Sequence, residues 1–227
     1  MARQLILASR SPRRLEALAA LGLRFIAEAS PVEADLPPAA DPTDPVPIAA
    51  AKAEDIASRH PDDVVLAGDT IVVLGREALG KPVDAADAEA MLRQLRGREH
   101  VVRTGLAVCA GSSLHTAEVA CPLLMREYTD EEVRAYVASG EPLDCAGAYD
   151  VHRLGGALVA EVRGCFSAVV GFPIVEAAAM LRAAGVDVLR DPAQVCTELY
   201  GRPCLALVRE TARACQSSSA AATAQGE

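Results

Sequence analysis

The feature that most constrains the fold is a long apolar stretch with one carboxylate at its centre. Residues 64–74 read VVLAGDTIVVL and are bounded by polar turn sequences. Such a β-branched run is typical of a strand buried on both faces. Burying an unpaired carboxylate is costly, so Asp69 needs a cation, a metal ion or several N–H donors. We expect either a structural aspartate bonded to a turn beside a bulge at Gly68, or a metal ligand or general base held on a rigid strand.

The first strand and helix of the chain predict a binding site for an anion. Residues 4–8 form a short apolar strand pattern, and Ser11 and Pro12 then favour the start of a helix. Three arginines crowd this helix start: Arg10, Arg13 and Arg14. The helix dipole is already positive there, and each cation costs about 0.3–1 kcal/mol. Backbone N–H groups and guanidinium groups together suit a phosphate, whereas a solvated basic turn is the structural alternative.

The rest of the chain mixes strand and helix patterns. Further strands are expected at residues 24–27, 101–109, 116–125, 155–162 and 168–172. Pro122 favours an edge position for the strand at 116–125. Helices are expected at residues 12–21, 48–59, 85–96, 130–139 and 174–184. Residues 36–47, rich in proline, are expected to form a loop or mobile flap, and residues 142–149 a loop of small side chains. The predicted class is α/β with a mixed sheet.

Composition limits the classes of function. The chain has 227 residues, of which 51% are hydrophobic and 23% charged, as in an ordinary globular protein with one core or one two-lobed domain. A net charge of −9 works against binding nucleic acid, so an anion site must be local. No apolar run approaches the about 18–20 residues of a membrane span, and the first residues lack a signal-peptide pattern, so we expect a cytoplasmic protein. The seven cysteines contain no CxxC pair, which disfavours a disulfide framework or a zinc cluster.

The use of lysine is selective. Of the 22 basic residues only Lys52 and Lys81 are lysine. A lysine that is retained in an arginine-rich chain indicates a position where a compact ammonium group is needed, although chance could also leave two.

Five motifs together resemble the Maf family of nucleoside triphosphate pyrophosphatases. They occur in the family's order and spacing over about residues 3–188, and they are LASxSPRR at 7–14, GDT at 68–70, GKP at 80–82, AGAY at 146–149 and VVGFP at 169–173. The resemblance implies an elongated mixed sheet flanked by helices, in two lobes with a central cleft, and a homodimer. It places the domain at residues 1–190, followed by an extension at 191–210; the low-complexity composition of residues 211–227 favours disorder.

The resemblance also implies an activity. Family members hydrolyse a nucleoside triphosphate between the α- and β-phosphates with a divalent metal, Mg²⁺ or Mn²⁺. They remove non-canonical or surplus nucleotides, and some are linked to cell-division arrest. By position, Asp69 matches the proton acceptor, and Glu33 and Asp69 match the metal ligands. The phosphate-binding set matches Ser9, Arg13, Arg14, Lys52 and Lys81.

Three departures from the family pattern bear on metal binding and base preference. Glu33 is followed by Ala34, so a second acid is missing or is replaced by Asp35. Cys145 stands where thymidine/uridine-type members carry lysine and is similar to the 7-methyl-GTP branch. His152 replaces a glutamine expected to contact the base, unless this histidine only packs. Arg13 and Thr70, in contrast, resemble the dTTP/UTP branch.

Two alternative functions stand beside this assignment. The related inosine/xanthosine triphosphate pyrophosphatases would carry Asn and Lys in the first loop, where this chain has Pro12, Arg13 and Arg14. A catalytically weak nucleotide-binding regulator of cell division is the other alternative, and Ala34 is the feature that favours it.

Overall fold

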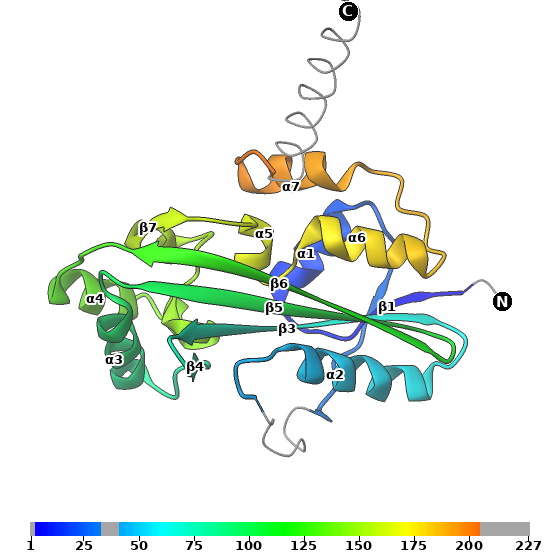
Figure 1. Cartoon of the computed structure of the whole chain (residues 1–227), viewed down its shortest axis with the longest axis horizontal. Coiled ribbons are helices and arrows are strands. Elements are labelled where there is room, and N and C mark those ends of the chain that lie inside the picture. The colour runs from blue at the N-terminus through cyan, green and yellow to red at the C-terminus, as the bar shows by residue number, and fades with distance from the viewer. Residues whose placement is uncertain (1–2, 33–40, 205–227) are drawn as a thin grey trace, which may run out of the picture.

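A single mixed sheet runs the length of the molecule. The structure is a computed structural model that describes residues 3–32 and 41–204. The strand order is β2-β1-β3-β5-β6-β7, and β4 pairs with β3. Pairing is parallel between β1 and both of its neighbours and antiparallel elsewhere (Figure 1). The strands are β1 Leu5–Leu7, β2 Ile26–Ala27, β3 Val64–Leu74, β4 Glu77–Leu79, β5 Glu99–Ala110, β6 Ser113–Met125 and β7 Val159–Val162.

Helices cover both faces of this sheet, as the α/β class predicts. The α-helices are α1 Pro12–Ala20, α2 Val46–Arg59, α3 Ala85–Leu95, α4 Asp130–Val137, α5 Phe166–Val169, α6 Ile174–Ala183 and α7 Pro192–Tyr200. Three 3₁₀ segments are η2 Glu141–Asp144, η3 Ala146–Ala148 and η4 Leu154–Leu158. Helix α2 packs on one face of the sheet and α1 and α6 on the other (Figure 1). None of the helices in the described ranges is long and apolar enough to cross a bilayer.

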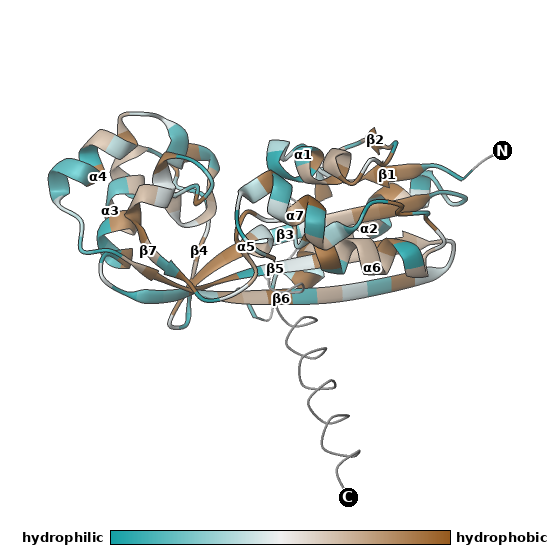
Figure 2. Ribbon diagram, turned by 90° about the horizontal axis from the view of Figure 1, so that it is seen from above, coloured by the Kyte–Doolittle hydropathy of each residue, from teal (hydrophilic) through white to brown (hydrophobic). Residues whose placement is uncertain are grey.

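Strand β3 passes through two lobes. We call the part packed by α1, α2 and α6 the first lobe and the part packed by α3, α4 and the 3₁₀ segments the second lobe (Figure 2). In the first lobe Leu66 faces α1 and α6, whereas Val65 faces α2. Burial on both faces explains why this stretch of the sequence does not alternate between apolar and polar residues. Val72 and Leu74 belong to the core of the second lobe, so Asp69 and Thr70 lie where the lobes meet.

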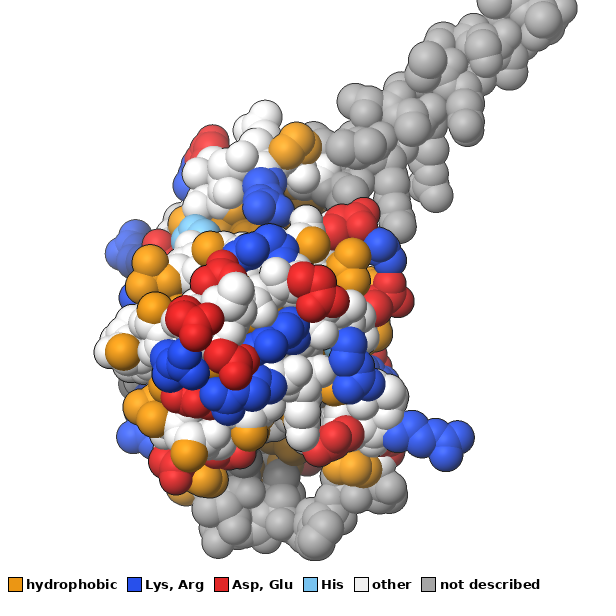
Figure 3. Space-filling view, turned by 90° about the vertical axis from the view of Figure 1, so that its left-hand side faces the viewer, with side chains coloured by type: hydrophobic (Ala, Val, Ile, Leu, Met, Phe, Trp, Pro, Cys, Tyr) orange, Lys and Arg blue, Asp and Glu red, His pale blue; other side chains and the backbone are white. Residues whose placement is uncertain are grey.

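Charged side chains are interspersed on the end of the second lobe. Figure 3 shows Lys and Arg next to Asp and Glu on this face. Within α3 and α4, Arg93 pairs with Glu89 at 2.6 Å and Arg134 with Glu131 at 2.7 Å. These exposed pairs are each worth less than about 1 kcal/mol, so the apolar core and not the surface charge holds this lobe together.

Local predictions failed where apolar runs were short. Residues 168–172 were predicted as a strand, but α5 ends at Val169 and a turn follows it. The prediction was wrong because a short run buried on all sides has no periodicity that separates strand from helix. The first residues of the strand predicted at 155–162 belong to η4, and the strand β7 begins only at Val159. The pairing of β3 with β5 is regular through Gly68, so the expected bulge is absent there.

The structure adds one helix that was not predicted and leaves several predictions untested. Helix α7 was not predicted, yet Val195 and Cys196 are buried in the core shared with α1 and α6. The predictions for Glu33, Asp35 and residues 36–40 of the proline-rich loop, and for the tail at 211–227, lie outside the described residues.

Candidate active site

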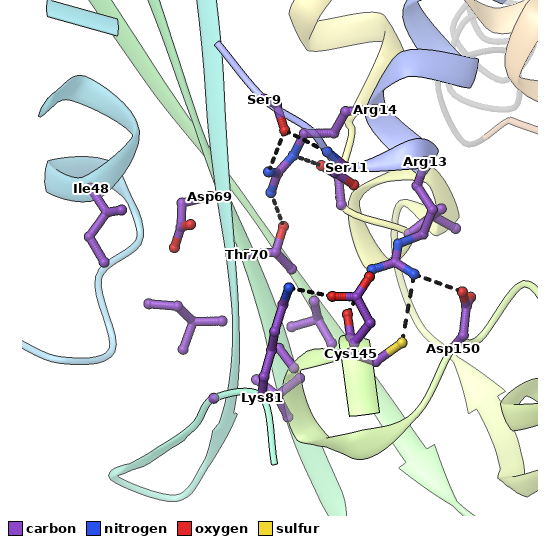
Figure 4. Close-up of a pocket in the computed structure, with 18 of the residues that line it drawn as sticks. Ser9, Ser11, Arg13, Arg14, Ile48, Asp69, Thr70, Lys81, Cys145 and Asp150 are labelled. Atoms are coloured by element: carbon purple, nitrogen blue, oxygen red, sulfur yellow. Dashed lines mark hydrogen bonds and ion pairs between the residues drawn. The ribbon is translucent and has the colours of Figure 1, made fainter. Parts of the chain in front are cut away.

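A cleft of about 900 Å³ lies where the two lobes meet. Its walls come from the β1–α1 loop, the middle of β3, the segment 144–151 and the turn 169–171 (Figure 4). This volume is within the range of about 300–1,000 Å³ that small-molecule sites occupy. Ser9, Arg13, Arg14, Lys52, Asp69, Thr70, Lys81 and Cys145 all line it. The structure therefore brings together almost every described residue that the sequence predicted for the site.

Asp69 is buried in this cleft and paired with Lys52. Lys52 Nζ donates to Asp69 Oδ1 at 2.8 Å, and the two side chains are only 11% and 12% exposed. Helix α2 supplies the lysine and β3 the aspartate. Gly105 lies opposite Asp69 on β5, and a Cβ atom there would come within 2.9 Å of the backbone of Pro45 and Val46. A glycine at this point therefore lets the start of α2 approach the sheet closely.

Arg14 connects the first loop to the centre of the sheet. Its Nε donates to the carbonyl of Gly171 at 3.0 Å, and its Nη2 donates to Thr70 Oγ1 at 3.0 Å. Its Nη1 donates to Ser9 Oγ at 3.3 Å (Figure 4). Gly171 has a φ of +101°, and a Cβ atom there would lie 3.1 Å from Thr70 Oγ1. The two motifs SPRR and VVGFP thus meet through one guanidinium group.

Ser9 is held as a hydrogen-bond donor toward the cleft. Its Oγ accepts from the backbone N–H of Ser11 at 3.2 Å and from Arg14. A hydroxyl group has two acceptor lone pairs, so its own hydrogen is what it can offer a ligand. Ser11 occupies the predicted N-cap position of α1 without a side-chain cap bond among the described residues. A serine donor beside a helix start suits a phosphate oxygen.

Arg13 reaches across the cleft from α1 to the segment 144–150, and Lys81, which follows β4 on the side of the second lobe, contacts the same segment. Arg13 Nη1 lies 2.9 Å from Asp150 Oδ2 and 3.6 Å from Cys145 Sγ. Lys81 Nζ lies 2.5 Å from Asp144 Oδ1. Burial raises the pKa of the Cys145 thiol, an effect that Arg13 opposes only partly, so this side chain is a neutral thiol at pH 7.

The structure places His152 outside the residues that line this cleft. Its ring makes edge-on contacts with Tyr200 at 5.0 Å and Phe166 at 6.4 Å between centroids. These contacts match the packing alternative considered for this histidine. Sequence reasoning missed Asp144 and Asp150, the acidic partners of Lys81 and Arg13. Asp150 directly follows the AGAY motif and is 5% exposed, and an acid next to an apolar motif was the signal available.

The described residues near Asp69 supply one carboxylate ligand for a divalent metal and not a complete set of ligands. No group of three His, Cys, Asp or Glu side chains able to hold a metal occurs among the residues described, and Glu33 lies outside them. Mg²⁺ prefers oxygen ligands, keeps several waters and is commonly held by one or two carboxylates together with substrate phosphates. Asp69 supplies one such carboxylate in the cleft. The described residues therefore fit a metal that arrives with a phosphate substrate.

The fold and cleft define an α/β protein that gathers cations and two buried carboxylates, Asp69 and Asp150, between two lobes. The model of the family described as "Maf-like protein" matches residues 4–184, and the chain belongs to this family. A "dTTP/UTP pyrophosphatase" of Anaeromyxobacter dehalogenans (strain 2CP-C) is 47% identical over 189 residues, which cover 82% of this chain and 96% of that protein. A protein of the same name from Myxococcus xanthus is 47% identical over 184 residues, covering 80% and 93%.

Solved structures show only a distant likeness. A HAM1 protein from Coxiella burnetii has a TM-score of 0.47 and 15% identity, covering 80% of this chain and 99% of that one. The membership of the chain in the Maf family rests on its sequence and not on this likeness.

Proposed function

We propose that this protein is a nucleoside triphosphate pyrophosphatase. It hydrolyses dTTP, UTP or both between the α- and β-phosphates, giving the monophosphate and diphosphate. The observation that carries the proposal is that both lysines of the chain line one cleft with Asp69 and the loop of Ser9 and Arg14. The names of relatives at 47% identity support the same activity.

Asp69 is the proton acceptor in this proposal. Lys52 holds Oδ1, which fixes the orientation of the carboxylate on a strand that cannot move without the whole sheet. The carboxylate orients a water molecule and takes its proton as the oxygen attacks phosphorus. A bound Mg²⁺ or Mn²⁺ would neutralise charge on the phosphate oxygens, with Asp69, and by family position Glu33, as its protein ligands.

The cations of the cleft bind the triphosphate. Arg14 and Ser9 present donors from the first lobe, and Arg13 and Lys81 stand at the side of the second lobe. Charge that spreads over the phosphate oxygens in the transition state is stabilised by such fixed donors. Arg13 and Lys81 are bonded to Asp150 and Asp144 in the structure, so the substrate replaces carboxylate oxygens with phosphate oxygens at the same nitrogens.

Base preference is assigned to the pyrimidine branch. Thr70 and Arg13, which resemble the dTTP/UTP type, both line the cleft. Cys145 also lines it and keeps a 7-methyl-GTP preference as the competing outcome. The homodimer, the cytoplasmic location and a role in cell-division arrest stay predictions.

A panel of substrates tests the proposal. Pyrophosphate release is measured with Mg²⁺ or Mn²⁺ from dTTP, UTP, CTP, their 5-modified forms, pseudouridine triphosphate and 7-methyl-GTP. We expect the highest kcat/KM for dTTP or UTP, and a preference for 7-methyl-GTP would make Cys145 the better guide. Stoichiometric binding by calorimetry with no pyrophosphate from any member of the panel would instead favour the regulator.

A further inference from the structure

Thr104 is a buried hydroxyl group that the proposed reaction does not use directly. It lies on β5 opposite Thr70 on β3, and it is 0% exposed. Its Oγ1 is 3.0 Å from Thr70 Oγ1 and 2.8 Å from the carbonyl oxygen of Ala168. It is not among the residues that line the cleft. Any effect of Thr104 on substrate must therefore pass through a neighbour.

The two ends of this contact chain fix the direction of every hydrogen bond in it. A guanidinium group can only donate, so Thr70 Oγ1 accepts from Arg14 Nη2 at 3.0 Å. A carbonyl oxygen can only accept, so Thr104 donates to Ala168. The contact between the two threonines then has Thr70 as donor and Thr104 as acceptor. Hydrogen bonds aligned in one direction polarise and strengthen one another.

The segment 168–171 holds Arg14 at two points. Ala168 closes the chain through Thr104, and Gly171, three residues later, accepts directly from Arg14 Nε at 3.0 Å. Two nitrogens of the guanidinium group are thus tied to one buried turn, which fixes the plane of the group. With that plane fixed, Nη1 meets Ser9 Oγ in the phosphate loop.

We propose that Thr104 is a positioning residue for Arg14 and Ser9, acting through the hydroxyl of Thr70. The proposal rests on the proposed function, because it assigns Thr104 to the binding of that triphosphate. Without the Thr104 hydroxyl, Thr70 loses the acceptor that orients it, and the hydrogen bond from Arg14 to Thr70 is no longer held in a fixed direction. Triphosphate binding then weakens, although no atom that touches the substrate has been removed.

The substitution Thr104→Val tests this, because valine has nearly the same shape and lacks the hydroxyl. We expect the Kd for the non-hydrolysable α,β-imido analogue of dTTP to rise about tenfold by calorimetry, and KM for dTTP to rise with it while kcat changes less than about twofold. Thr104→Ser, which keeps the hydroxyl, is expected to restore wild-type affinity. Thr197→Val is the matched control, since it also removes a threonine donor to a backbone carbonyl, but on α7 away from the cleft.

A double-mutant cycle separates positioning from general destabilisation. In a Thr70→Val background, Thr104→Val should add little to the Kd, because the link to Arg14 is already broken. Full additivity, wild-type affinity in Thr104→Val, or an equal loss in Thr197→Val would each overturn the proposal. If Thr104→Val does not fold, the comparison of Thr104→Ser with Thr104→Ala takes its place. Analogue binding without turnover of any triphosphate by the wild type would refute the pyrophosphatase while leaving the Thr104 test intact.

Discussion

Two lysine–aspartate pairs line the same cleft and differ mainly in burial. Lys52 and Asp69 are 2.8 Å apart with side chains 11% and 12% exposed, whereas Lys81 and Asp144 are 2.5 Å apart with side chains 62% and 70% exposed. The first pair joins a helix to a central strand, and the second joins the loop after β4 to the end of η2 at the mouth of the cleft. The two pairs therefore differ in their contribution to stability although their distances are similar, because water competes for the exposed pair and hardly reaches the buried one.

The buried pair carries the chemistry, so the largest effect is expected from Asp69→Asn. The amide has nearly the shape of the carboxylate but cannot take a proton, and loss of a general base lowers kcat by about 10²–10⁴-fold. Pyrophosphate release measures the loss. The circular dichroism spectrum and the Kd for the imido analogue should stay close to wild type, and near-normal kcat in this variant would remove Asp69 from the role of base.

The buried His100–Tyr149 pair is neutral, in contrast to the buried Lys52–Asp69 pair, and it makes stability depend on pH. His100 Nε2 lies 2.6 Å from Tyr149 Oη, and burial lowers the pKa of His100 from 6.5 to about 4. The unfolded chain gains this proton near pH 6.5 while the folded protein does not, so stability is present above pH 6.5 and is lost as the pH falls toward 4. The loss reaches about 3 kcal/mol, from 1.36 kcal/mol for each pKa unit.

The measurement is urea unfolding between pH 7 and pH 4.5, compared between wild type and His100→Gln. Glutamine can still bond Tyr149 but does not titrate in this range. In the variant, the free energy of unfolding should fall less steeply with decreasing pH. The slope of free energy against pH should be smaller by an amount that corresponds to the uptake of up to one proton on unfolding. Parallel curves for the two proteins would show that His100 is not held neutral.

Lys52→Met tests how much the burial of the Lys52–Asp69 pair matters for stability. It leaves Asp69 without its ammonium partner in a poorly hydrated site, and we expect a loss of about 1.5–3 kcal/mol in the free energy of unfolding, the range for a hydrogen bond to a charged group. Asp69→Asn combined with Lys52→Met should recover part of this loss, since no unpaired carboxylate remains. Urea denaturation of the four proteins in this cycle provides the numbers.

The parts of the site that could be predicted from the sequence are those marked by an unusual charge within one segment. Asp69 was identified as exceptional because β3 is long, apolar and buried on both faces, and a charge inside such a run needs a partner. The arginines at the start of α1 were conspicuous because they oppose the helix dipole. Both signals can be recognised from neighbouring residues in the sequence, without knowledge of the tertiary structure.

Features at the second lobe's side of the cleft gave no such signal. The pairing of Arg13 with Asp150 joins residues far apart in the chain, and only the assembled lobes bring them to 2.9 Å. His152 matched a family position, but its surroundings depend on Tyr200 in α7, a helix that the sequence analysis did not predict. Residues 168–172 were predicted as a strand, whereas they form the end of α5 and a turn. Two carbonyl groups there accept hydrogen bonds from Arg14 and Thr104, side chains of other elements that the local sequence does not reveal.

The smallest stability effect is expected from Lys81→Met, which completes the comparison. An exposed ion pair contributes little, so the free energy of unfolding should change by less than about 0.5 kcal/mol. The KM for dTTP should nevertheless rise about three- to tenfold at low salt, because the lysine binds phosphate only when substrate arrives. Salt screens the attraction between exposed charges, with a Debye length of about 10 Å at 0.1 M, so the gap in KM between wild type and variant should narrow as salt is added. A stability loss as large as that of Lys52→Met would show that burial does not separate the two pairs.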